Sequence, residues 1–244
     1  MKILYFTATG NSLYIAKSLG GELLSIPQLI KSKTYSIEDD TVGIVFPCFY
    51  WGVPEIVENY LKKAEITADY IFAVVSYGSS VGKTFDILNN LVAIDYARSV
   101  CMVDNYVPIY DIEEELLKKD QREIDGELSK IKYDTEKKTR NFKSNKLKYY
   151  IANTSSYILK NVFSKGDRLT IDAESCTKCK TCIQVCPMDN IKFSEKIEIE
   201  NRCIFCLACL HACSSYSIHT PREKSKIHYT NPKIKISEII KSNR

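Results

Sequence analysis

Eight of the ten cysteines lie between positions 176 and 213 and repeat one spacing. In each repeat, three cysteines are separated by two residues and a fourth follows after three more; the repeats are Cys176, Cys179, Cys182, Cys186 and Cys203, Cys206, Cys209, Cys213. Three such thiolates can wrap one cubane iron–sulfur cluster, while the fourth, which is followed by Pro187 in the first repeat, ligates the other cluster. The spacing therefore predicts two 4Fe–4S clusters, one held by Cys176, Cys179, Cys182 and Cys213 and the other by Cys203, Cys206, Cys209 and Cys186.

Two other uses of clustered cysteines fit the sequence less well. A disulfide scaffold needs an oxidising compartment, and the N-terminal stretch MKILYFTATG is too short and too polar for a secretory signal peptide. Zinc ribbons use two cysteine pairs about fifteen residues apart rather than runs of four. The segment instead resembles the two-cluster bacterial-type ferredoxins, with one departure, because Ser214 stands where those proteins have a second proline.

A second candidate site follows the first apolar run, residues 2–6, where the chain reads Thr7-Ala8-Thr9-Gly10-Asn11-Ser12 and then continues with a helical apolar pattern. A helix N-terminus combined with hydroxyl groups binds anions, and Gly10 allows close backbone approach. The loop has neither the lysine of a Walker sequence nor the glycines of a dinucleotide fingerprint. It therefore indicates a site for one terminal phosphate; a plain helix start capped by Thr9 or Asn11 is the alternative.

Two further loops follow apolar runs that are typical of buried parallel strands, residues 41–46 and 70–76. The first loop contains Tyr50, Trp51 and Gly52, and the second contains Tyr77 and Gly78. Aromatic faces stack on flat heterocycles, so both loops are candidates for holding a planar ring. The alternative is an aromatic plug that packs the edge of the sheet.

The apolar runs alternate with helical patterns along the first hundred residues. The predicted strands are residues 2–6, 22–26, 41–46, 70–76 and 98–103. This alternation predicts a doubly wound α/β sheet, whose ligands bind beyond the carboxyl ends of the strands. Cys101 is expected to be a buried core thiol and Cys48 a structural one.

The phosphate loop resembles that of the flavodoxins, Thr/Ser-x-Thr-Gly-x-Thr/Ser directly after the first strand. The resemblance implies five parallel strands in the order 2-1-3-4-5 and a bound FMN. The implied phosphate contacts are Thr7, Thr9, Gly10, Asn11 and Ser12, and the implied ring contacts are Tyr50, Trp51, Gly52, Tyr77 and Gly78.

The rest of the chain suggests four parts: a flavodoxin-like FMN-binding domain (1–110), a helical extension and linker (111–166), a small two-cluster ferredoxin-like domain (167–222) and a tail (223–244). In the extension we expect one long helix to close the sheet and another to lead to the cluster domain. Residues 31–40 are expected to form a loop, residues 169–171 and 191–193 short strands, and the tail a short helix or strand that packs back on the protein. His211 lies between two predicted ligands and is expected to lie beside a cluster or at the surface. The basic residues of the extension suggest a solvated face or, alternatively, docking to an acidic redox protein or an anionic membrane surface; they are Lys137, Lys138, Arg140, Lys143, Lys146 and Lys148. No apolar run approaches the roughly 18 residues of a transmembrane helix, and a cytoplasmic location is expected.

As a whole the chain resembles the fused flavodoxin–ferredoxin proteins of anaerobic bacteria and archaea. The resemblance implies an electron-transfer protein that relays electrons between FMN and two 4Fe–4S clusters and serves unidentified donor and acceptor proteins. A flavin-dependent oxidoreductase that reduces a small molecule, and a redox or iron sensor, are the alternatives. No catalytic dyad or triad is apparent, and the mild net charge of +4 gives no reason to expect nucleic acid as a partner.

Overall fold

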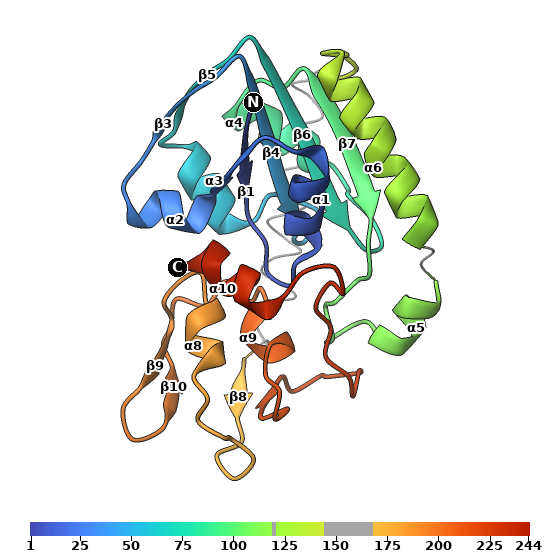
Figure 1. The fold of residues 1–244 in the computed structure, drawn as a ribbon. Coiled ribbons are helices and arrows are strands. Elements are labelled where there is room, and N and C mark those ends of the chain that lie inside the picture. The colour runs from blue at the N-terminus through green and yellow to red at the C-terminus, as the bar shows by residue number, and fades with distance from the viewer. Residues whose placement is uncertain (119–120, 144–167) are drawn as a thin grey trace.

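The computed structural model describes residues 1–118, 121–143 and 168–244. Its centre is a five-stranded parallel sheet (Figure 1). The strands are β1 (Lys2–Tyr5), β2 (Glu22–Ser25), β4 (Thr41–Pro47), β6 (Tyr70–Tyr77) and β7 (Tyr96–Cys101). Their order is β2-β1-β4-β6-β7, which confirms the 2-1-3-4-5 arrangement. The sheet and its helices fit a flavodoxin-like α/β domain.

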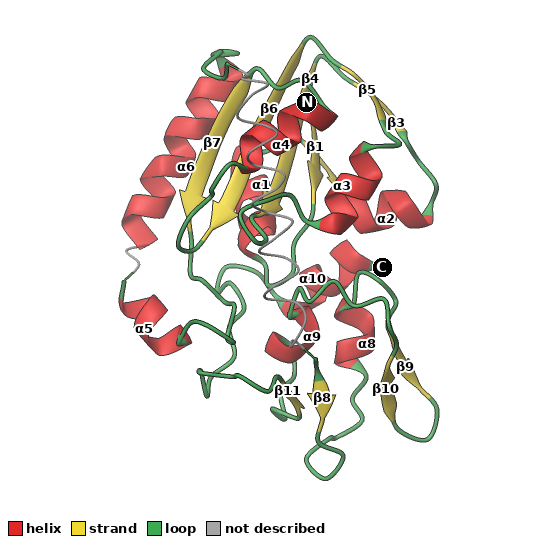
Figure 2. Cartoon of the chain, turned by 180° about the vertical axis from the view of Figure 1, so that it is seen from behind, coloured by secondary structure: helices red, strands yellow, loops and turns green. Residues whose placement is uncertain are grey.

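Helices cover both faces of this sheet (Figures 1 and 2). One face carries α1 (Asn11–Leu19) and α6 (Gln121–Glu136), and the other carries α3 (Glu55–Leu61) and α4 (Thr84–Leu91). Because successive strand residues point to opposite faces, Ile3 and Tyr5 join one apolar cluster while Leu4 and Phe6 join the other. This two-sided burial explains why the strands are apolar throughout.

Several predicted boundaries were wrong. The second strand ends at Ser25, and Pro27 lies in the first turn of α2 (Ile26–Lys31), a position where proline costs no hydrogen bond. The stretch expected to be a loop before residue 41 contains β3 (Ser36–Glu38), which pairs with β5 (Glu65–Thr67). The fifth strand begins two residues earlier than residue 98, at Tyr96, and Cys101 is half-buried rather than buried.

A small second domain follows the gap in the described residues. Two short antiparallel pairs, β8 (Thr170–Ile171) with β11 (Ile218–His219) and β9 (Ile191–Phe193) with β10 (Ile197–Ile199), flank the helices α8 (Thr181–Val185) and α9 (Ala208–His211). The strands near 169–171 and 191–193 were predicted, whereas β10 and β11 were not.

The extension between the two domains is described only in part. It contains α5 (Ile112–Leu117) and α6, and α6 packs on β7 as the helix predicted to close the sheet. Of the six basic residues singled out in the sequence, two form ion pairs in the described part of the chain, Lys138 with Asp40 and Arg140 with Asp95. The second expected helix and two further lysines, Lys146 and Lys148, lie outside the described residues. Within the described ranges, no helix is both long enough and apolar enough to cross a bilayer.

The tail returns to the body of the protein and contacts both domains. It ends in α10 (Ile236–Asn243), which packs against α2 of the sheet domain and α8 of the cluster domain (Figure 1). Tyr5 Oη and Ser242 Oγ lie 2.8 Å apart, within hydrogen-bonding distance, and Ile239 is 1% exposed. The tail was predicted to pack back as a short helix or strand, and it does so as a helix.

This packing predicts a large effect of truncating Ile239. Ile239→Ala should lower the free energy of unfolding by about 2–5 kcal/mol, since it removes buried methyl and methylene groups and leaves a cavity. The matched control is the exposed neighbour Lys241, where alanine should change stability by no more than about 0.5 kcal/mol. Urea unfolding of the full chain measures both variants, and equal losses would contradict the docking of α10.

Candidate cofactor sites

The eight clustered cysteines surround two separate cavities. Site A is lined by Cys176, Cys179, Cys182 and Cys213. Site B is lined by Cys186, Cys203, Cys206 and Cys209. This is the division that the spacing predicted, with the fourth cysteine of each repeat joining the other three. In the described part of the chain, no group of three or more His, Cys, Asp or Glu side chains is placed to hold a single metal ion. Cysteines that line a cavity suit a cluster of atoms better than one ion.

The backbone bends in the same way in both repeats. Residues with a left-handed backbone conformation recur at equivalent positions: Lys178 (φ 56°), Lys180 (φ 63°) and Asp189 (φ 48°) in the first repeat, and Phe205 (φ 52°), Leu207 (φ 61°) and Tyr216 (φ 53°) in the second. Each such residue costs roughly 1–2 kcal/mol when it is not glycine. Strain of this kind persists only where the surroundings enforce it, and it marks functional sites.

Backbone amides also point at the cysteine sulfurs. Asn190 N–H donates to Cys186 Sγ at 3.4 Å, and at the equivalent place Ser217 N–H donates to Cys213 Sγ at 3.3 Å. Phe205 N–H donates to Cys203 Sγ at 3.4 Å. Hydrogen bonds to the sulfurs are one means by which proteins tune cluster potentials.

Burial sets the protonation of these thiols. Burial raises the pKa of Cys182 to about 11 and holds the pKa values of Cys206 and Cys209 well above their usual range. The pKa of the exposed Cys179 is lowered instead, by hydrogen bonding with Thr181. The buried thiols are therefore protonated at neutral pH when no metal is bound, and binding of a cluster releases their protons.

A third and larger cavity, of about 300 Å³, lies at the carboxyl end of the sheet. Such volumes are at the lower end of those found for small-molecule sites. Eight of the ten predicted contacts line it, namely Thr7, Thr9, Asn11, Ser12, Tyr50, Trp51, Tyr77 and Gly78. Gly10 and Gly52 do not line it and instead shape the loops behind it. The cavity therefore brings together the three loops that the sequence singled out.

One end of this cavity is rich in hydroxyl groups. Thr7 Oγ1 accepts a hydrogen bond from Gly10 N–H at 3.1 Å, and Thr9 Oγ1 accepts one from Asn105 Nδ2 at 2.5 Å. A hydroxyl that already accepts still has its own proton to donate. The first turn of α1 adds N–H groups without intrahelical acceptors. Neutral donors thus converge where an anion would bind.

The start of α1 differs from the alternative interpretation, a helix capped by the side chain of Thr9 or Asn11. The residue before α1 is Gly10, with φ 97° and no side-chain cap. The side chain of Asn11 is turned away: its Nδ2 donates to Val103 O, and its Oδ1 accepts from Tyr229 and Asn231 of the tail. Neither Thr9 nor Asn11 is the N-cap.

The other end of the cavity is aromatic. Tyr50 and Trp51 have φ values of 50° and 59° and form a tight turn, closed by two hydrogen bonds between the backbones of Phe49 and Gly52. Positive φ at both central residues is the type I′ geometry. Trp51 is 47% exposed, so the turn presents a large flat side chain at the mouth of the cavity. Cys48 lies beneath it, and burial raises the pKa of its thiol to about 11.

Sequence reasoning missed two walls of the cavity. The loop after the fifth strand contributes Asp104, Asn105 and Tyr106, and the cluster domain contributes Phe205, Cys206 and Leu207. The first wall could have been found, because loops after parallel strands meet at one edge of the sheet. The second depends on how the domains pack, which no local pattern encodes.

His211 was expected to lie beside a cluster or at the surface, and it is buried. Its Nε2 donates to Asn105 O at 2.8 Å and its Nδ1 accepts from Tyr229 N–H at 3.2 Å. Burial lowers the pKa of His211 to about 4, so the ring is neutral and its tautomer is fixed by these two partners. It joins α9 of the cluster domain to the cavity loop of the sheet domain.

Comparison with known families identifies the smaller domain. Residues 168–214 match the model of a family described as a 4Fe-4S dicluster domain. The match covers both cysteine repeats and does not extend into the sheet. This part of the chain is therefore a ferredoxin-like domain that binds 4Fe–4S clusters, in keeping with an iron–sulfur electron-transfer role. Among curated proteins, no relative of the chain was found.

The close approach of two cavity loops yields a second prediction. A Cβ atom on Gly78 would lie 2.1 Å from Asp104 Oδ2, so Gly78→Ala must displace the loop after β7 and should lower the free energy of unfolding by about 1–3 kcal/mol. Gly126, on the exposed side of α6 with no atom near its Cβ position, is the control. Gly126→Ala should instead stabilise the chain by about 0.5–1 kcal/mol. Thermal unfolding distinguishes the opposite signs, and a stabilising Gly78→Ala would refute the contact.

Proposed function

We propose that this chain is an electron-transfer protein in which FMN, bound in the large cavity, exchanges electrons with two 4Fe–4S clusters bound at sites A and B. The observation that carries the proposal is the composition of the cavity wall. Hydroxyl and aromatic loops of the sheet domain form most of it, and Phe205, Cys206 and Leu207 of the cluster domain complete it. A ligand held there touches the domain that binds the clusters.

The shape and chemistry of the cavity support FMN. Thr7, Thr9 and the start of α1 offer neutral donors to a phosphate, and Tyr50, Trp51 and Tyr77 offer faces and edges to a flat ring. Among the residues that the structure describes, no lysine or arginine lines the cavity, so a phosphate there would be held by hydrogen bonds and the helix N-terminus. FMN transfers electrons singly or in pairs, which lets it work with one-electron clusters.

The protein itself would hold the redox centres close together and shield the space between them from water. Joining the two domains in one chain raises the effective concentration of each redox centre at the other. The tail, with α10 between α2 and α8, restricts their relative motion further. The buried wall of Phe205 and Leu207, 8% and 2% exposed, excludes water from the space between cavity and clusters.

Cofactor analysis after anaerobic purification tests the proposal as a whole. Filled sites should give about eight iron and eight sulfide per chain, together with one FMN. Zinc in place of iron would refute the cluster assignment. Iron and sulfide without flavin, even after incubation with FMN, would leave an iron–sulfur carrier and refute the FMN assignment.

Turnover of a small molecule is the second candidate function. Trp51 and Ile109, 47% and 37% exposed, lie at the cavity, and a small molecule could reach a bound ring beside them. Steady-state reduction of quinones or nitro compounds by the loaded protein would favour an oxidoreductase over a relay. Its absence across such a panel, with rapid reduction of a carrier protein, would favour the relay.

Removal of the Thr9 hydroxyl tests how the phosphate is held. Thr9→Val keeps the shape of the side chain but removes a donor to a charged group, worth about 1.5–3 kcal/mol, so FMN should bind roughly 10- to 100-fold more weakly. Riboflavin, which has no phosphate, is the matched control ligand and should bind to Thr9→Val and to the parent chain equally. Titration of flavin fluorescence measures both affinities. Equal losses for the two flavins would place the phosphate elsewhere.

A further inference from the structure

We propose that the cluster at site B is the direct electron partner of the flavin, and that the cluster at site A reaches the flavin through site B. This inference rests on the proposed function and adds an order to it. Each transfer moves one electron, so the donor cluster is oxidised by one electron and the flavin is reduced by one. The electrons come from an external one-electron donor, and the protons that a reduced flavin takes up come from solvent.

The first argument is that site B and the large cavity share a wall. Cys206 lines both, and so does Leu207. None of the four cysteines of site A lines the large cavity. A cluster bound through Cys206 Sγ would thus have one of its ligands in the wall against which the flavin rests. Because electron transfer through protein slows steeply with distance, this shared ligand favours site B.

The local backbone explains how Cys206 reaches that position. Phe205 and Leu207, on either side of it, both adopt the left-handed conformation, with φ 52° and 61°. The equivalent bend in the first repeat, at Lys178 and Lys180, surrounds the exposed Cys179 instead. The same backbone shape therefore turns one cysteine toward the sheet domain and its counterpart toward solvent.

Aromatic rings close the space around this wall. The ring of Phe205 packs edge to face on Tyr106 at 6.0 Å between centroids, and Tyr106 packs in the same way on Tyr50 at 5.9 Å. Tyr106 and Tyr50 belong to the sheet domain, so the contact is continuous across the domain boundary. It packs the cavity loops of the sheet domain against the segment that carries Cys206, which restrains the separation between a bound flavin and site B.

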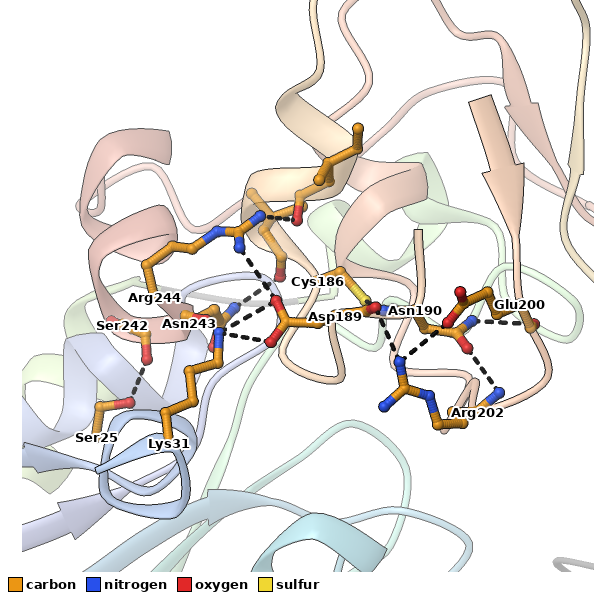
Figure 3. A network of polar contacts seen from close by, with 12 residues as sticks. Ser25, Lys31, Cys186, Asp189, Asn190, Glu200, Arg202, Ser242, Asn243 and Arg244 are labelled. Carbon is orange, nitrogen blue, oxygen red and sulfur yellow. Dashed lines mark hydrogen bonds and ion pairs between the residues drawn. The ribbon is translucent and has the colours of Figure 1, made fainter. Parts of the chain in front are cut away.

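Polar contacts hold site B against the sheet domain at a second point (Figure 3). Asp189, three residues after Cys186, pairs with Lys31 of α2 at 3.0 Å and with Arg244 at 3.1 Å. Asn243 Nδ2 donates to Val185 O at 2.8 Å, directly before Cys186. The segment that carries Cys186 is thus tied both to the sheet domain and to the tail.

A third tie runs through the helix that carries Cys209. His211 of α9 donates to Asn105 O, and Asn105 Nδ2 donates to Thr9 Oγ1 of the hydroxyl loop. Site B is therefore linked to both ends of the cavity, at Tyr106 and at Thr9. These links keep the spacing between site B and a bound flavin constant.

Exposure to solvent does not distinguish the two sites. Each has one exposed cysteine, Cys179 at site A and Cys203 at site B. An external protein could therefore exchange electrons with either cluster. The two sites differ instead in their contact with the large cavity, which only site B shares through Cys206. The test must therefore measure the interaction between a bound flavin and each cluster.

Two matched variants separate the sites. Cys203→Ala should remove the site B cluster and Cys179→Ala the site A cluster, and because both residues are exposed, the cost to folding should be similar. The full chain is loaded anaerobically with FMN, iron and sulfide, and reduced stepwise with dithionite. Electron paramagnetic resonance then measures how fast the one-electron-reduced flavin relaxes, since a nearby paramagnetic cluster accelerates relaxation.

We expect Cys179→Ala to keep the accelerated relaxation of the parent chain and Cys203→Ala to lose it. The reverse pattern, or equal effects of both variants, would overturn the order while leaving the proposed function intact. A parent chain that binds clusters but no flavin would instead refute the FMN assignment and this inference with it. If either variant fails to fold, the pair Cys186→Ala and Cys176→Ala gives the same comparison.

Discussion

The cluster domain must maintain two cysteine-lined cavities with very little regular secondary structure. Its paired strands are two or three residues long, and α8 and α9 have five and four residues. A single hydrophobic core in a domain this small contributes little stability, and natural small domains commonly add metals or cross-links. The clusters and the contact with the sheet domain therefore stabilise the strained bends at Lys178, Lys180, Phe205 and Leu207, and the rest of the arrangement follows from that need.

The contact with the sheet domain is extensive and mostly apolar. A single hydrophobic core includes Val100 and Val107 of the sheet domain together with Val185 and Leu210 of the cluster domain. Apolar burial is the main source of stability in such contacts. Ion pairs such as Lys31 with Asp189, with side chains 28% and 40% exposed, add little energy and instead set the orientation. The two domains thus share a core, and a change at their boundary affects both the stability of the chain and the geometry between the sites.

The features that could be predicted depend on residues close together in the sequence, whereas the features that were missed depend on residues far apart in it or on very short strands. The grouping of the cysteines follows from spacings of two and three residues, and the strand order from the resemblance of one loop, so both could be predicted. Contacts that close the large cavity join distant residues, such as Thr9 with Asn105 and Asn11 with Tyr229, and no periodicity encodes them. The pair β3 and β5 was missed because each strand has three residues, too few to show an alternation.

The electrostatics of the large cavity bear on the direction in which electrons would move. In the described part of the chain, Asp104 lines it and no lysine or arginine does. A carboxylate next to a group that gains an electron disfavours the gain, and the effect is larger where water is excluded. A flavin held there would therefore be harder to reduce than one beside a lysine. The N–H donors at Cys186, Cys203 and Cys213 act in the opposite direction, because they stabilise the added negative charge of a reduced cluster. The chain's own groups would thus lower the potential of a flavin in the cavity and raise the potentials of the clusters on the other side of the wall at Cys206.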